Sequence, residues 1–188
     1  MPSVSSATSM TPGVPANKDF VPLAGRRATG ILATMYSDGL TLKQLTRDEC
    51  LQLMASAPVG RIIYTRQALP AVELVNFALD NGDIIIRTDR TGKLAAATRG
   101  AVVAFEADCV DPECRVGWSV TVVGQSQEVT DPDEISRLEQ IGLRSWAPGD
   151  RDHFIRIRPG LLNGRRLSAD GSECGHRILQ QCASADSL

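Results

Sequence analysis

The chain has 188 residues, of which 43% are hydrophobic and 22% charged, and its formal net charge at pH 7 is -2. This length suits one domain with tails, and the acidic balance argues against a nucleic-acid-binding protein, which usually carries a basic face. No stretch approaches the roughly 20 apolar residues that cross a bilayer, and the N-terminus lacks the pattern of a secretory signal. We therefore expect a cytoplasmic protein without nucleic-acid or membrane partners.

The ends of the chain differ in composition from its middle. Residues 1–40 mix Ser, Thr, Pro and Gly without a helical or strand period, which predicts a disordered N-terminal tail. Residues 169–188 are polar and also lack a strong period, so they are predicted to be a flexible C-terminal tail. One folded domain is expected over residues 41–168.

The five cysteines do not form a close CxxC pair. Because their number is odd, reduced thiols fit better than a disulfide framework. Cys174, His176 and Cys182 lie close together near the C-terminus. A structural zinc site normally needs four ligands at tight spacings, so we interpret this stretch as a frayed tail rather than a metal site.

The first ordered element is predicted to be a short helix. Thr46 is followed three residues later by Glu49, which is the pattern of a capping box, and Pro58 ends the helix. The stretch "VGRIIYT" then reads as a strand. "PAVELVNFAL" and "DIIIRTD" flank Asn-Gly, the favoured two-residue turn of a β-hairpin.

That turn sets the register of the hairpin. It places Leu79 opposite Ile84 and Phe77 opposite Ile86, and it makes Asn76 and Arg87 neighbours on one face. The residues on the other, mostly apolar face are Val75, Phe77, Leu79, Ile84, Ile86 and Thr88.

The second half of the domain is predicted to contain more strands and two short helices. A helix is expected over residues 92–99, and "AVVAFEADC", "GWSVTVVGQSQEV" and "HFIRIRP" read as strands. Asp131, Pro132 and Glu134 mark another helix start; its apolar stripe is Ile135, Leu138 and Ile141. The strands lie too close together for βαβ crossovers, so we expect a mainly antiparallel small barrel with peripheral helices.

The turn after "DIIIRT" concentrates basic and hydroxyl residues at the start of a helix. It has the length of a nucleotide-hydrolysing P-loop, but Arg87 stands in place of the first glycine and Leu94 in place of the magnesium-binding hydroxyl, so nucleotide hydrolysis is rejected. Two interpretations remain, a solvated charged turn and an anion site.

A site for one phosphate needs less than a P-loop does. Thr91 can cap the helix, which leaves the backbone amides of Gly92, Lys93 and Leu94 free for an anion. Lys93 adds a mobile charge, Arg87 adds a planar guanidinium that matches phosphate oxygens, and Thr88 adds a hydroxyl donor.

The order and spacing of these segments resemble the pyridoxamine 5′-phosphate oxidase-like, FMN-binding split-barrel family, in its actinobacterial branch. The resemblance covers about residues 41–168; its segments are "PAVELVNF", "DIIIRTDRTGKL", "VAFEADCVDP", "GWSVTVVGQSQEV", "WAPGDRDHFIRIRP" and "NGRRL". It implies a six-stranded antiparallel split β-barrel that forms a homodimer and holds FMN at the subunit interface.

The resemblance also implies roles for single residues. The family's phosphate-binding positions match Arg87, Thr88, Gly92 and Lys93, and Asn76 would lie beside the ribityl chain or ring. Trp118 and Ser119 would reach the cofactor of the other subunit. Two alternatives stay open, because Trp118 could instead plug the barrel and Asn76 could satisfy a bulge.

The expected activity is hydride transfer between bound flavin and an unknown small molecule, because the flavin supplies the chemistry and the protein its position. The groups that bind pyridoxamine phosphate in the classical enzymes cannot be placed here, and His153 and His176 are the only histidines. The alternative is a binding or sequestering module for flavin, deazaflavin or haem that catalyses no reaction.

Overall fold

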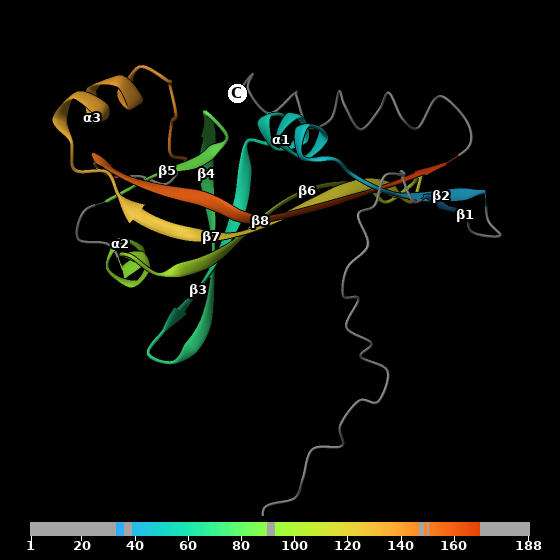
Figure 1. Cartoon of the computed structure of the whole chain (residues 1–188), viewed down its shortest axis with the longest axis horizontal. Coiled ribbons are helices and arrows are strands. Elements are labelled where there is room, and N and C mark those ends of the chain that lie inside the picture. Colours follow the sequence, from blue (N-terminus) through green and yellow to red (C-terminus); the bar gives the residue numbers. More distant parts are fainter. Residues whose placement is uncertain (1–32, 36–38, 90–92, 147–148, 150, 170–188) are drawn as a thin grey trace, which may run out of the picture. The chain divides into compact units, whose positions relative to one another are not determined.

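The structure is a computed structural model that describes residues 33–35, 39–89, 93–146, 149 and 151–169. Its elements are β1 (Ala33–Met35), β2 (Leu40–Gln44), α1 (Arg47–Ala55), β3 (Val59–Arg66), β4 (Leu69–Asp80), β5 (Asp83–Thr88), α2 (Lys93–Thr98), β6 (Val102–Asp111), β7 (Val116–Glu128), α3 (Pro132–Glu139) and β8 (His153–Ala169) (Figure 1). The predicted mainly β fold with short helices is confirmed.

The strands pair antiparallel throughout the described sheet. Their order is β1-β2-β8-β5-β4-β3-β6-β7, and β7 also pairs with β8, so β3 to β8 are linked in a closed ring. The long strand β8 makes this possible, because it pairs with β7 along one edge and with β5 and then β2 along the other (Figure 1). β1 and Leu40 lie inside the predicted tail 1–40, so the sheet begins earlier than expected.

β8 continues well past the predicted strand "HFIRIRP", although Pro159 would normally interrupt a strand. The ladder between β7 and β8 is irregular between Val123 and Gly124, and Gly124 pairs with Pro159. A Cβ at Gly124 would lie 2.1 Å from the carbonyl oxygen of Arg158. The glycine therefore lets the two backbones approach closely at the irregularity that accommodates the proline.

Local signals in the sequence set the ends of α1 and α3. The hydroxyl of Thr46 accepts a hydrogen bond from the Glu49 amide at 3.3 Å, and the Glu49 carboxylate accepts one from the Thr46 amide at 2.8 Å, which is the predicted capping box. Asp131 caps α3 by accepting from the Asp133 amide at 2.9 Å. Both predicted helix starts are confirmed.

The β4–β5 hairpin has the predicted turn and register. Asn81 and Gly82 have φ angles of 52° and 85°, as a type I′ turn requires. Phe77 pairs with Ile86 and Leu79 with Ile84, as predicted, and the ladder ends at the first of these pairs. Asn76 pairs with Val59 on the β3 side of β4, and the same register places it opposite Arg87, one position beyond the last pair of the β4–β5 ladder.

The β3–β4 hairpin turns at Gln67 and Ala68, whose φ angles are 51° and 62°. For residues other than Gly, Asn and Asp, this left-handed conformation costs free energy. Replacing the pair by Asn-Gly should therefore raise the free energy of unfolding by about 1 kcal/mol, or Tm by about 2–4 °C. Thermal unfolding measures the change, and an unaltered Tm would show that the turn is not strained.

The described core has two parts. The larger lies inside the ring of strands and includes Ile84, Ile86, Phe77 and Phe105, with the Phe77 and Phe105 rings 4.9 Å apart in an edge-to-face arrangement. The smaller lies under α3 and is formed by Ile85, Val129, Leu138 and Phe154. Ile141, predicted to extend the apolar stripe of α3, is exposed because the helix ends at Glu139.

The cysteines differ from the expectation of reduced thiols. Cys50 is a buried free thiol, and burial raises its pKa. Cys109 and Cys114 are disulfide-bonded. Their spacing in the sequence does not predict this, because disulfide formation depends on how closely the two residues approach in space. Cys174, His176 and Cys182 lie outside the described residues. Among the described helices, none has the length and apolar character of a membrane span.

Candidate functional site

The predicted basic turn lies between the end of β5 and the start of α2. Thr88 is buried and is the register partner of His153 at the start of β8. The side chain of Leu94 is buried in the larger core, so only its amide remains for an anion. Gly92 lies outside the described residues, and Lys93 is the first residue of α2.

Arg87 is held in place by the chain between α3 and β8. Its Nε donates a hydrogen bond to the carbonyl oxygen of Arg151, and its Nη1 donates to that of Leu143 at 3.4 Å. The guanidinium carbon also lies 5.5 Å from the centre of the Phe154 ring, which is within the range of a cation–π contact. Arg87 therefore fixes both ends of this connection.

Asn76 contacts the same connection from the neighbouring strand. Its Nδ2 donates to the carbonyl oxygen of Pro58 at 3.1 Å, and its Oδ1 accepts from the backbone amide of Trp146 at 2.8 Å. Asn76 and Arg87, neighbours by the register of β4 and β5, therefore both hydrogen-bond the chain between α3 and β8.

A cavity of about 620 Å³ lies beside Asn76. We call it the Asn76 cavity; it is lined by residues 54–58 at the end of α1, residues 76–79 of β4, and residues 141–144 and 146. Its volume lies within the roughly 300–1,000 Å³ of small-molecule sites. Trp146 and Ile141 line it with exposed side chains. Sequence analysis identifies neither as a site residue, because the apolar stripe of α3 predicts Ile141 in the core and no motif distinguishes Trp146.

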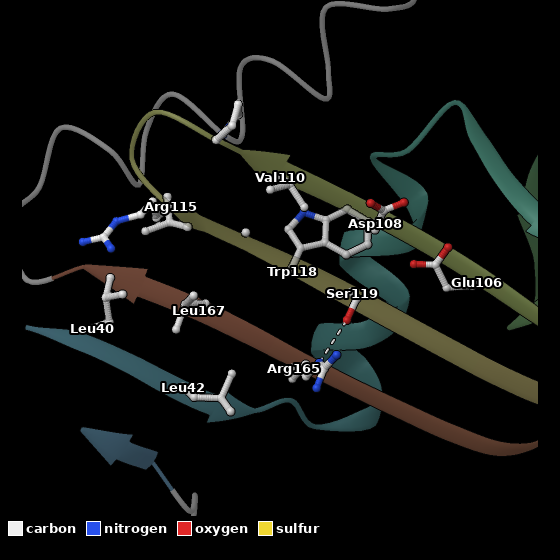
Figure 2. A pocket seen from close by; sticks show the side chains of 13 residues that line it. Leu40, Leu42, Glu106, Asp108, Val110, Arg115, Trp118, Ser119, Arg165 and Leu167 are labelled. Atoms are coloured by element: carbon white, nitrogen blue, oxygen red, sulfur yellow. Dashed lines mark hydrogen bonds between the residues drawn. The ribbon is translucent and has the colours of Figure 1, made fainter. Parts of the chain in front are cut away.

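Trp118 and Ser119 lie at a different cavity of about 850 Å³, the Ser119 cavity. Figure 2 shows Glu106 and Asp108 of β6 on one side of this cavity and leucines of β2 and β8 on the other. Its lining residues are Leu40, Leu42, Glu106, Asp108, Val110, Pro112, Arg115, Val116, Gly117, Trp118, Ser119, Arg165 and Leu167. In one chain, therefore, Trp118 and Ser119 line a different cavity from Asn76.

The two adjacent residues Trp118 and Ser119 point to opposite faces of β7. Trp118 is only 3% exposed and belongs to the larger core, the arrangement that the barrel-plug alternative predicts. Its indole Nε1 has no hydrogen-bond partner among the described residues. The Ser119 hydroxyl accepts from Nε of Arg165 at 3.4 Å on the outer face (Figure 2).

An apolar row crosses the outer face of the sheet from β4 to β8. Its members are successive register partners: Val72, Ile63, Ala104, Val123 and Leu161. The end residues Val72 and Leu161 are 60% and 63% exposed. A contiguous exposed apolar surface on a soluble protein typically marks an interaction site.

Comparisons with known proteins agree on one family. Residues 46–166 match the family described as pyridoxamine 5′-phosphate oxidase. The uncharacterized protein Rv0080 of Mycobacterium tuberculosis is 42% identical over 132 residues, which are 68% of this chain and 86% of the relative.

Two solved structures are similar along nearly their whole length. An FAD-binding protein from Mycobacterium smegmatis is 32% identical, with a TM-score of 0.57, and the match covers 65% of this chain and 96% of that protein. A protein from Corynebacterium glutamicum, described as a candidate pyridoxamine 5′-phosphate oxidase, is 30% identical, with a TM-score of 0.61 and coverages of 70% and 96%.

Proposed function

Since this chain belongs to the pyridoxamine 5′-phosphate oxidase family, we propose that it binds a flavin, FMN in the first instance, and is an oxidoreductase acting on a small molecule. The observation that carries the proposal is the Asn76 cavity, whose wall is held by Asn76 and by Arg87 at the strand end that precedes the basic turn. A bound flavin supplies hydride chemistry, and the protein supplies its position.

The chemistry of the donors fits a phosphorylated cofactor. Arg87 uses two of its five N–H groups on carbonyl oxygens of the described residues, which leaves others for phosphate oxygens. Thr88 follows directly in the chain, and α2 begins five residues later at Lys93. We assign the phosphate to this strand end and the ring to the Asn76 cavity.

The apolar row supports the further proposal that two copies associate through their outer sheet faces. Burying Val72 and Leu161 against a second copy would remove exposed apolar surface from water. In such a dimer the Ser119 cavity of one copy would face the cofactor of the other. Ser119 and Arg165 would then complete the site across the interface.

Val72→Lys should convert the dimer to a monomer, because the interface would have to bury a charge without a partner. Sedimentation or size-exclusion chromatography measures the change. Leu69→Lys is the matched control, since Leu69 is 68% exposed but lies at the β3–β4 turn, outside the row. A Val72→Lys protein that remains dimeric would exclude the row as the interface.

The absorbance of the purified protein tests the cofactor. A flavin spectrum that bleaches when a nicotinamide donor is added supports the oxidoreductase, and mass analysis of the released cofactor separates FMN from FAD and deazaflavin. A Soret band would show that the bound cofactor is haem rather than flavin. A protein that neither carries nor takes up any flavin would overturn the proposal.

One observation favours the alternative of a binding module without turnover. His153 is buried, its Nε2 lies 3.5 Å from a carboxylate oxygen of Glu128, and it is not among the residues that line the Asn76 cavity. A flavin that stays oxidised with every reductant tested would support the binding module over the enzyme.

A further inference from the structure

Trp146 combines an exposed side chain with a fixed backbone. Its side chain is 62% exposed, although tryptophan carries one of the largest apolar surfaces of any residue. Its amide nevertheless donates to Oδ1 of the half-buried Asn76 at 2.8 Å.

The surrounding contacts hold the same segment from a second strand. Arg87 donates to the carbonyl oxygen of Leu143, three residues before Trp146, and to that of Arg151 just before β8. Asn76 is itself fixed at its other end by Pro58. Asn76 thus holds the backbone of Trp146 itself, and Arg87 holds the same connection on either side of it.

The location of the indole suggests what it contacts. Trp146 lines the Asn76 cavity, most of whose surface is polar, together with Pro58 from the end of α1. An aromatic side chain whose backbone is held beside a cavity of this size can stack on a planar ring. The side chain loses little conformational entropy on binding, because only its two torsions become fixed.

We propose that Trp146 stacks on the ring of the bound flavin and that Asn76 acts as a positioning residue for Trp146 rather than as a direct ligand. This inference rests on the proposed flavin site and specifies its ring-binding part. It assigns the ring to residues 141–146 of the same chain and leaves the phosphate to the basic turn.

The test compares FMN and riboflavin, which share the ring and differ by the phosphate. Trp146→Ala should weaken binding of both ligands by the same factor, roughly two- to tenfold, and should reduce the quenching of flavin fluorescence on binding. Trp146→Phe should restore most of the affinity. Leu69→Ala, which removes an equally exposed apolar side chain outside the cavity, should change neither quantity.

A double-mutant cycle separates positioning from direct contact. Asn76→Ala should weaken the binding of both ligands in the wild-type background and have no further effect on it in the Trp146→Ala background. Additive losses would show that Asn76 contacts the cofactor itself. Should Asn76→Ala fail to fold, Trp146→Ala against Trp146→Phe still decides the stacking.

Two negative results have different meanings. A wild-type protein that binds flavin, with Trp146→Ala matching it in affinity and quenching, would overturn the stacking of Trp146 and leave the proposed function standing. A wild-type protein that binds neither FMN nor riboflavin would overturn the proposed function and this inference together.

Discussion

Asp80→Asn should lower the free energy of unfolding by about 2–3 kcal/mol at neutral pH. Asp80 is 8% exposed, and its two oxygens each accept a hydrogen bond from Arg137 of α3 at 2.8 Å. Nη2 of Arg156 in β8 also donates to it at 3.2 Å. The value stays moderate because Arg137 is 48% exposed and its charge is partly screened.

The same pair should make stability depend on pH. Hydrogen bonds from Arg137 lower the pKa of Asp80 from its ordinary 3.8. A carboxyl whose pKa is lower in the folded than in the unfolded state stabilises the fold above its unfolded pKa, and this contribution is lost as the pH falls through the folded pKa. Wild type should therefore lose more stability than Asp80→Asn as the pH is lowered below about 4.

Urea unfolding between pH 7 and pH 3 measures both effects. Asp83→Asn is the matched control, because Asp83 is more exposed and accepts one hydrogen bond from Arg156 at 3.2 Å. It should cost less than about 1 kcal/mol. Equal losses in the two variants, or parallel pH profiles for Asp80→Asn and wild type, would contradict the assignment.

The position of this pair links stability to the candidate site. Arg137 lies in the last turn of α3, and the Asn76 cavity is lined by the residues that follow the helix. Loosening α3 should therefore also disturb Trp146, although Asp80 does not line that cavity. Flavin affinity measured on the Asp80→Asn protein at neutral pH reports that second effect.

Features set by neighbouring residues could be predicted from the sequence. The Asn-Gly turn fixed the register of the β4–β5 hairpin, and Thr46 with Glu49 fixed the start of α1. The β3–β4 turn escaped prediction because Gln67 and Ala68 are not residues that favour positive φ. Its left-handed conformation is imposed by the pairing of the strands on either side.

The contacts of the candidate site could not be predicted in the same way. The face of Asn76 follows from strand alternation, but its partners Pro58 and Trp146 lie 18 and 70 residues away. Those contacts depend on how the sheet closes and on where α3 ends. The exposed row of Val72 and its partners likewise requires the pairing of strands that are distant in the sequence.

Lys93→Ala should weaken FMN binding about tenfold to a hundredfold and leave riboflavin binding nearly unchanged. The substitution removes one charge-assisted contact with the phosphate, worth about 1.5–3 kcal/mol, and riboflavin has no phosphate. Arg99→Ala is the matched control, because Arg99 lies just past the other end of α2 and pairs with Glu128 at 3.0 Å. It should affect neither ligand.

Arg87→Ala should weaken FMN binding at least as much as Lys93→Ala does, but with a different selectivity. Arg87 also donates to the carbonyl oxygens of Leu143 and Arg151, so its loss should disturb the position of Trp146 as well as the phosphate contact. Riboflavin binding should therefore fall in this variant and not in Lys93→Ala. Isothermal titration of both ligands against both variants measures the contrast. If Lys93→Ala weakened FMN and riboflavin equally, or weakened neither, residues 87–93 would be a solvated turn and the phosphate would have to bind elsewhere.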